Sequence, residues 1–125
     1  MAGTGDDRNE QWADGLAIYT AMFGKERARR RLADDDPQAA RLTDLLLEYA
    51  YGAVWSDETL SRRERSLITV ALLAGLGRNE ELATHAGAAL KNGCTLPELH
   101  EVMIQVGLYC GFPATLGGAR VLKTL

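Results

Sequence analysis

One histidine interrupts an otherwise apolar helical pattern in the second half of the chain. His85 recurs at helical spacing with Leu82, Ala86 and Ala89, so its imidazole is expected within an apolar stripe. Histidine is the side chain that most often works as a general acid or base near neutral pH. The alternative is a hydrogen-bonded histidine of the core, and the helical pattern by itself favours that structural role.

A carboxylate and an amide interrupt a second apolar pattern. The segment LHEVMIQVGLYCG, residues 99–111, is apolar on nearly all sides except at Glu101 and Gln105. These two residues are four positions apart, so they share one helix face and could line a polar pocket. Alternatively, Glu101 belongs to a solvated first turn, where a carboxylate favours the helix dipole. His100 is about 100° away around the helix, which indicates a surface position.

Arginines cluster where a helix is expected to begin. The segment SRRERS, residues 61–66, contains Arg62, Arg63 and Arg65. Positive charge at a helix N-terminus opposes the helix dipole, which suggests a purpose such as holding a carboxylate. Solvated surface charge is the common alternative.

The elements that must position these side chains are all helices. Apolar residues recur at spacings of three and four, whereas no segment alternates apolar and polar residues over the length of a strand. We therefore predict an all-α fold of about six helices in a single compact domain, residues 1–125. The expected helices span about 12–23, 37–51, 61–76, 79–92, 95–110 and 113–125, with a helical turn or two in the basic segment after residue 24.

Capping signals support several of these boundaries. Serine or threonine followed three positions later by glutamate predicts capping boxes at Ser61 and Thr95. Asp36 is expected to cap the second main helix, and Asn79 the fourth. Gly93 suits the left-handed position after a helix.

Composition excludes several classes of protein. The 125 residues have a formal charge of −3 and no basic block, so nucleic acid is not an expected partner. No apolar run approaches the ~20 residues of a membrane span, and the polar start MAGTGDDRNE does not resemble a signal peptide. We therefore expect a cytoplasmic protein that does not interact with membranes. Cys94 and Cys110 are sixteen positions apart, which predicts two reduced thiols and no metal site.

The order of several motifs resembles the carboxymuconolactone decarboxylase family, part of the alkylhydroperoxidase-like superfamily. The motifs are YAYGAVW, RRERSL, HAGAALKNG and ELHEVMIQVGLYCGFPA, and the resemblance covers about residues 48–115. It is strongest to the 4-carboxymuconolactone decarboxylases, whose first helix the segment GLAIYTAMFG also resembles. The resemblance implies an alkylhydroperoxidase-like helical fold.

The redox branch of this superfamily carries a CxxC motif and a histidine after the glutamate. In an alignment on Glu101 these would fall at Pro113, Leu116 and Arg120, and none of the three matches. Without a second thiol beside it, Cys110 cannot support a paired-thiol cycle. Decarboxylases often have a polar residue where this chain has Leu116 and an arginine near Gly87, so the pocket and the substrate are expected to differ.

The resemblance implies a carbon–carbon lyase that removes CO₂ from an unsaturated carboxy-lactone in aromatic catabolism, without metal or organic cofactor. It implies His85 as proton donor or general acid and Glu101 as its partner. Arg65 is a candidate anchor for a substrate carboxylate, with Gln105 and Tyr109 as further substrate-binding residues. The alternatives are a cofactor-free lactone isomerase or cyclase in specialised metabolism, and a non-catalytic oligomeric binding protein.

We expect the partners to be a small carboxylated lactone and further copies of the chain. Family members assemble, which implies a homo-oligomer, either a trimer or a hexamer. The apolar run at residues 67–76 and the apolar segment at 99–111 would be difficult to bury in one subunit.

Overall fold

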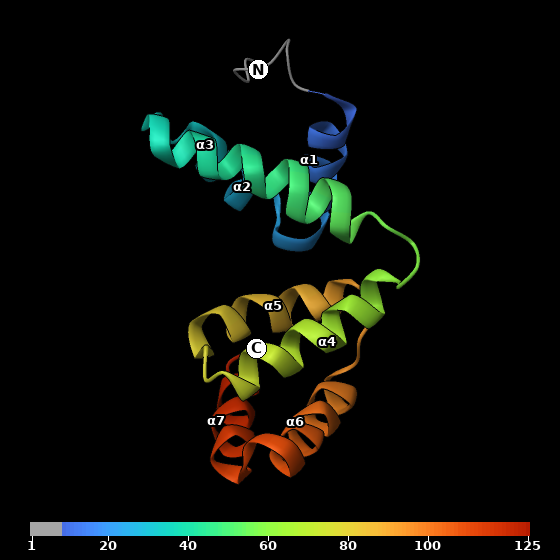
Figure 1. The fold of residues 1–125 in the computed structure, drawn as a ribbon. Helices are drawn as coiled ribbons and strands as arrows, with labels where there is room; N and C mark the ends of the chain where they lie inside the picture. Colours follow the sequence, from blue (N-terminus) through green and yellow to red (C-terminus); the bar gives the residue numbers. More distant parts are fainter. Residues whose placement is uncertain (1–8) are drawn as a thin grey trace. The chain divides into compact units, whose positions relative to one another are not determined.

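The protein is all-helical. The computed structural model describes residues 9–125; residues 1–8, from which most of the argument against a signal peptide came, lie outside this part. Within residues 9–125 there is no β-strand, which confirms the predicted all-α class (Figure 1). In chain order the helices are α1 (Glu10–Phe23), α2 (Lys25–Ala33), α3 (Pro37–Leu45), the π-helix η1 (Leu46–Trp55), α4 (Arg62–Gly75), α5 (Asn79–Lys91), α6 (Leu96–Cys110) and α7 (Phe112–Leu122).

The chain forms two compact units. Unit 1 ends at Thr59 and contains α1 to η1, and unit 2, Leu60–Leu125, contains α4 to α7. The single domain expected for residues 1–125 therefore stays a prediction. None of the helices within residues 9–125 has the length and apolar character needed to span a bilayer.

The first helix of unit 1 ends at Phe23 as predicted, but it begins at Glu10, two residues before the expected start. The Asn9 side chain caps α1 by accepting a hydrogen bond from the backbone of Trp12 at 2.8 Å. Gly24, with a φ of 94°, separates α1 from α2, a conformation that favours glycine. The second helix has nine residues, longer than the turn or two expected. Asp36 caps α3 through the backbone N–H of Ala39, as predicted.

The second main helix differs from the prediction in length and form. It was expected to end near Tyr51, but it continues to Trp55, and its last ten residues are π-helical. Figure 1 shows α3 and η1 as one continuous rod. Helix α1 packs along η1 at two glycines, since a Cβ on Gly15 would overlap the carbonyl oxygen of Leu47, and one on Gly52 that of Gln11. These glycines permit a close approach of the two backbones.

Aromatic rings fill the core of unit 1. The ring of Tyr51 lies 6.0 Å from Trp55 in a stacked arrangement and 5.4 Å from Tyr19, edge to face. Such pairs contribute beyond the area that they bury. Burial raises the pKa of the Tyr51 hydroxyl to about 12, because the phenolate would lose its hydration.

In unit 2, α4 to α7 surround one apolar core. Both predicted capping boxes are present, at Ser61 with Glu64 and at Thr95 with Glu98. The Asn79 cap is wrong: Arg78 is the N-cap of α5 and provides no side-chain hydrogen bond, and Asn79 is already helical. The core is formed by Val70, Ala74, Leu82, Ala86, Ala89, Cys94, Leu99, Met103, Val106 and Leu122.

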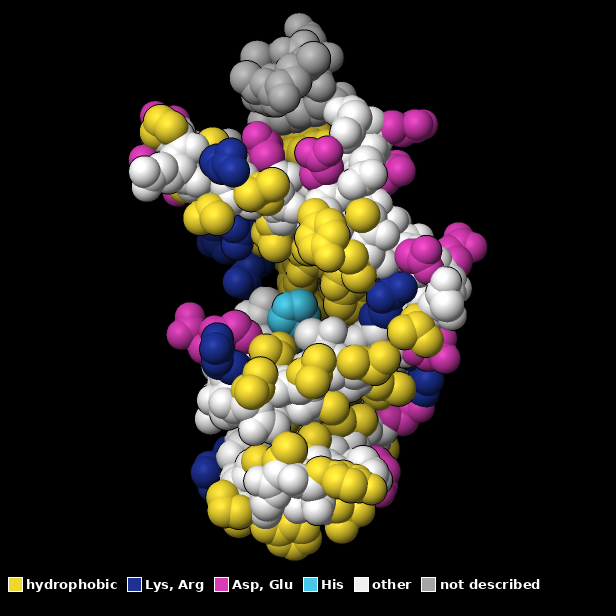
Figure 2. Space-filling view, viewed as in Figure 1, with side chains coloured by type: hydrophobic (Ala, Val, Ile, Leu, Met, Phe, Trp, Pro, Cys, Tyr) yellow, Lys and Arg dark blue, Asp and Glu magenta, His cyan; other side chains and the backbone are white. Residues whose placement is uncertain are grey.

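Helix α6 is buried on one side only. Leu99, Met103 and Val106 point into the core, whereas Ile104 and Leu108 are 49% and 67% exposed. The apolar pattern of this helix therefore does not place it at the centre of unit 2. Figure 2 shows hydrophobic side chains on the outer surface of the α6 and α7 region. A surface of this kind is typical of a face that meets another molecule.

Candidate functional site

Three of the five predicted site residues follow one face of α6. Glu101, Gln105 and Tyr109 are spaced four residues apart, so they lie one above the other along the helix. Glu101 and Gln105 line an open depression of about 250 Å³, together with Leu67, Glu98 and Val102. The structure thus brings together the carboxylate and the amide whose spacing suggested a polar pocket.

Tyr109 continues this face beyond the depression. It lies one turn further along α6 than Gln105, near the end of the helix at Cys110, and is 83% exposed. Its ring and hydroxyl are therefore accessible from solvent, although they do not line the depression.

His85 lies on α5, at the edge of its buried face. Leu82, Ala86 and Ala89 are fully buried and belong to the core, while His85 is half-buried. The imidazole is therefore not enclosed in the core, as a purely structural histidine would be. His85 does not line the depression beside Glu101. A pocket shared by these two residues stays a prediction.

Arg65 lies on α4, away from the depression. Leu67 lines the depression and is two residues further along, which places the two side chains about 200° apart around the helix. Arg65 is half-buried, and its Nε atom is inaccessible to solvent. Any carboxylate that it anchors would approach a different side of α4.

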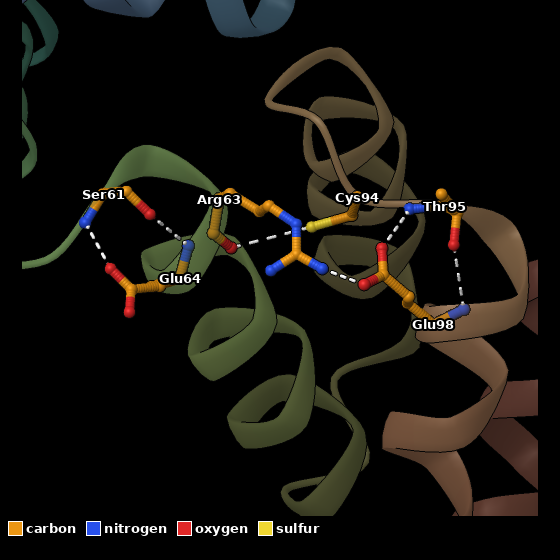
Figure 3. A network of polar contacts seen from close by, with 6 residues as sticks. All are labelled: Ser61, Arg63, Glu64, Cys94, Thr95 and Glu98. Carbon is orange, nitrogen blue, oxygen red and sulfur yellow. Dashed lines mark hydrogen bonds and ion pairs between the residues drawn. The ribbon is translucent and has the colours of Figure 1, made fainter.

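Arg63 is the arginine of this segment that holds a carboxylate. Its guanidinium donates to Glu98, a residue that lines the depression (Figure 3). The other oxygen of Glu98 accepts a hydrogen bond from the Thr95 backbone at 2.8 Å. The backbone carbonyl of Arg63 also accepts a hydrogen bond from the Cys94 thiol, at 3.6 Å. The start of α4 is thereby tied to the segment that leads into α6.

This network sets the charge beside Glu101. Arg63 offsets the negative charge of Glu98, so the depression carries less net negative charge than its two carboxylates would give alone. Burial raises the pKa of the Cys94 thiol, although Arg63 opposes this effect. The sequence pattern identifies Arg63 only as a member of an arginine cluster, and Glu98 only as a capping residue. Both residues lie in the first turn of a predicted helix, and this shared position is the sequence feature that could have suggested their ion pair.

The cysteines and acidic residues give no sign of a metal centre. Cys94 is buried and Cys110 exposed, and both are free thiols. Within residues 9–125 no three His, Cys, Asp or Glu side chains gather as metal ligands would.

The positions where the chain departs from the decarboxylase pattern are accessible. A Cβ on Gly87 would meet no atom within 4 Å, so there is open space beside this residue. Leu116 is 57% exposed on α7. Arg120, which stands where the redox branch would have a histidine, is exposed one turn further along. The differences therefore alter the surface of unit 2 and leave its core unchanged.

Comparisons with known proteins identify the family of the chain. The sequence model of the Carboxymuconolactone decarboxylase family matches residues 40–124. The chain is 35% identical over 106 residues to 4-carboxymuconolactone decarboxylase from Acinetobacter baylyi, which covers 85% of this chain and 79% of that protein. It is 31% identical over 114 residues to nitrosuccinic acid decarboxylase npaB from Metarhizium robertsii, which covers 90% of this chain and 80% of that protein. The chain belongs to the carboxymuconolactone decarboxylase family.

Proposed function

We propose that this protein is a cofactor-independent decarboxylase of a small carboxylated substrate, an unsaturated carboxy-lactone of the 4-carboxymuconolactone type. The observation that carries this proposal is the family match over residues 40–124, which includes all five candidate site residues. The two similar proteins described above are both named decarboxylases, which supports the reaction class.

The decarboxylation requires two things: a group that accepts an electron pair, and a source of one proton. When the carboxylate on the γ carbon leaves as CO₂, the pair of the broken C–C bond moves through the alkene onto the lactone carbonyl oxygen. The resulting dienolate then takes one proton at its α carbon. A protein can promote both steps with a donor to the oxygen and a positioned acid, without a metal ion.

The candidate residues supply these groups. We assign to His85 the donation of a hydrogen bond or proton, because its imidazole is half-buried beside apolar residues. Glu101 orients the imidazole or relays its proton, and Gln105 and Tyr109 contact the substrate. We also propose Arg65 as the anchor of a substrate carboxylate through its guanidinium fork, although it faces a different side of α4 from the depression that contains Glu101. The ion pair of Arg63 with Glu98 supports this assignment, since it reduces the repulsion that an anionic substrate would meet near Glu101.

A second substrate class is supported by the relative named nitrosuccinic acid decarboxylase. A nitro group can accept the electron pair in place of the lactone, so the demands on the protein are the same. A third candidate is a cofactor-free lactone isomerase or cyclase. The open space beside Gly87 and the exposed Leu116, where the chain departs from the decarboxylase pattern, favour this alternative.

Measurement of CO₂ release separates these candidates. The purified chain is incubated with 4-carboxymuconolactone or with nitrosuccinate, and CO₂ is quantified together with the organic product. Release from the lactone supports the first assignment, and release only from nitrosuccinate supports the second. Conversion of a lactone without CO₂ would indicate an isomerase or cyclase, and binding without turnover would indicate a binding protein.

We also propose that the chain forms a homo-oligomer, a trimer or a hexamer. Large apolar side chains on the outer faces of unit 2 support this: Leu72, Leu76, Leu108 and Phe112 are each at least 60% exposed. A second copy of the same chain is the partner that a closed symmetric assembly provides. Light scattering at micromolar concentration tests the assembly, and a stable active monomer would contradict it.

A further inference from the structure

A second hollow lies in unit 1, far along the sequence from the candidate catalytic residues. It has a volume of about 460 Å³ and opens between α1, α2 and α3. Its lining residues are Tyr19, Arg27, Arg30, Arg31, Asp34, Ala39, Leu42 and Thr43. We call it the arginine pocket. Its size is within the range of pockets that bind small organic molecules.

Positive charge dominates one side of the arginine pocket. Arg27, Arg30 and Arg31 are spaced three and four residues apart, so they project from one face of α2. Asp34 is the single carboxylate in the lining, which leaves an excess of two positive charges. Figure 2 shows Lys and Arg side chains gathered on the α2 side of unit 1. The whole chain has a formal charge of −3, so this concentration of cations is local.

The arginines of the pocket outnumber the carboxylates near them, which are Asp34 in the lining and Glu26, whose charge also acts on Arg30. Like charges three and four residues apart on a helix repel one another. A different arginine on the same helix, Arg29, is neutralised by Glu26, which accepts a hydrogen bond from its Nε atom at 3.1 Å. Within residues 9–125, none of the three arginines of the pocket forms an ion pair of this kind with a carboxylate. A bound anion would remove the repulsion.

The inner part of the arginine pocket offers hydroxyl groups and apolar surface. Tyr19 and Thr43 are only 3% and 5% exposed, so they form its deepest part. The Tyr19 hydroxyl accepts a hydrogen bond from the Nε atom of Arg31 at 3.0 Å, and its own hydrogen can be donated to a ligand. The Arg31 guanidinium also lies 5.6 Å from the centre of the Tyr19 ring. This contact fixes the guanidinium before any ligand arrives.

We propose that the arginine pocket binds a small organic dicarboxylate. The two excess charges match a dianion, and guanidinium groups bind carboxylates in a two-point fork. Ala39 and Leu42 form an apolar wall that suits a short hydrocarbon chain between the carboxylates. Inorganic phosphate would use the charge but would not use this wall. The inference does not depend on the proposed decarboxylase activity.

Isothermal titration of the full chain with glutarate tests this binding. We expect saturable binding of glutarate, no binding of its uncharged diamide, and weaker binding of inorganic phosphate. Arg30→Gln should weaken the binding of glutarate at least about tenfold, because it removes a charge-assisted contact. Arg29→Gln is the matched control on the same helix and should bind glutarate as the unchanged protein does.

Several results would overturn the proposal. These are the absence of saturable binding, equal losses in Arg30→Gln and Arg29→Gln, or phosphate binding as tight as that of glutarate. Loss of binding in Arg65→Gln alone would place the ligand in unit 2 and also overturn it. Circular dichroism shows whether Arg30→Gln is folded; if it is not, Arg30→Lys keeps the charge, and the loss of the guanidinium fork should still weaken binding.

Discussion

Arg63 at the start of α4 is paired with Glu98 in the first turn of α6, although the two residues are 35 positions apart in the sequence. Arg63 lies between Ser61 and Glu64 of one capping box, and Glu98 is a member of the other, so one ion pair joins two helix N-termini. Because Glu98 and Glu101 are on the same helix and line the same depression, the pair helps to fix the position of Glu101.

A double-mutant cycle should detect this pairing. Arg63→Met, Glu98→Gln and the double variant are unfolded in urea, and the coupling free energy is calculated. Both side chains are about 40% exposed, so solvent screens the interaction, and we expect a coupling of only about 0.5–1 kcal/mol. It should decrease in 1 M NaCl. Arg62→Met is the matched control, and a coupling to Glu98 as large as that of Arg63 would contradict a specific pair.

Substitution of His85 should remove activity without unfolding the protein. Under the proposed mechanism, His85→Gln loses the proton donor, and kcat should decrease by about 10²-fold to 10⁴-fold. His85 is half-buried, so the loss of stability should be small compared with that of a core substitution. Steady-state measurement of CO₂ release gives kcat, and urea unfolding gives stability. His100→Gln is the control, and comparable losses in both variants would refute a specific role for His85.

Much of the fold could be predicted from the sequence because local signals determine it. The capping boxes at Ser61 and Thr95, and the left-handed glycine at 93, each depend on residues within a few positions. The π-helical form of η1 could not be predicted in this way. It accompanies the close contact of Gly52 with α1, and such a contact between distant segments leaves no local pattern.

The candidate site was predictable in part for the same reason. Glu101 and Gln105 line one depression because they are four residues apart on a single helix. The pairing of Arg63 with Glu98 depends on how α4 meets α6, which residue spacing does not reveal. In the basic segment after Gly24, residue spacing alone places the arginines on one helix face. It does not predict the pocket that they line, because residues of α1 and α3 also form that pocket.

Two glycine substitutions should have opposite effects on stability. Gly15 and Gly87 both lie within helices, where alanine is favoured over glycine by up to about 1 kcal/mol. At Gly87 nothing lies within 4 Å of an added Cβ, so Gly87→Ala should be neutral or stabilising. At Gly15 the Cβ would overlap the backbone of Leu47, and α1 would have to move from η1. We expect Gly15→Ala to cost about 2 kcal/mol or more. Equal urea midpoints for the two variants would contradict the close helix contact.

Ionisation of Tyr51 should destabilise the protein at alkaline pH. The pKa of its hydroxyl is raised to about 12 in the folded protein, compared with about 10 in an unfolded chain. Between these values the folded state binds more protons than the unfolded state, so stability falls as pH rises. A shift of about two units corresponds to a loss of up to about 2–3 kcal/mol once both states have ionised.

Tyr51→Phe isolates this effect because it keeps the ring and removes the ionisable hydroxyl. The free energy of unfolding in urea is measured for both proteins from pH 8 to 11.5. Below about pH 9.5 the difference between them should be constant, since the hydroxyl is neutral in both states. Above about pH 10 the unchanged protein should lose stability progressively relative to Tyr51→Phe. If Tyr51→Phe and the unchanged protein gave parallel curves across the whole range, the Tyr51 hydroxyl would not be buried as the structure places it.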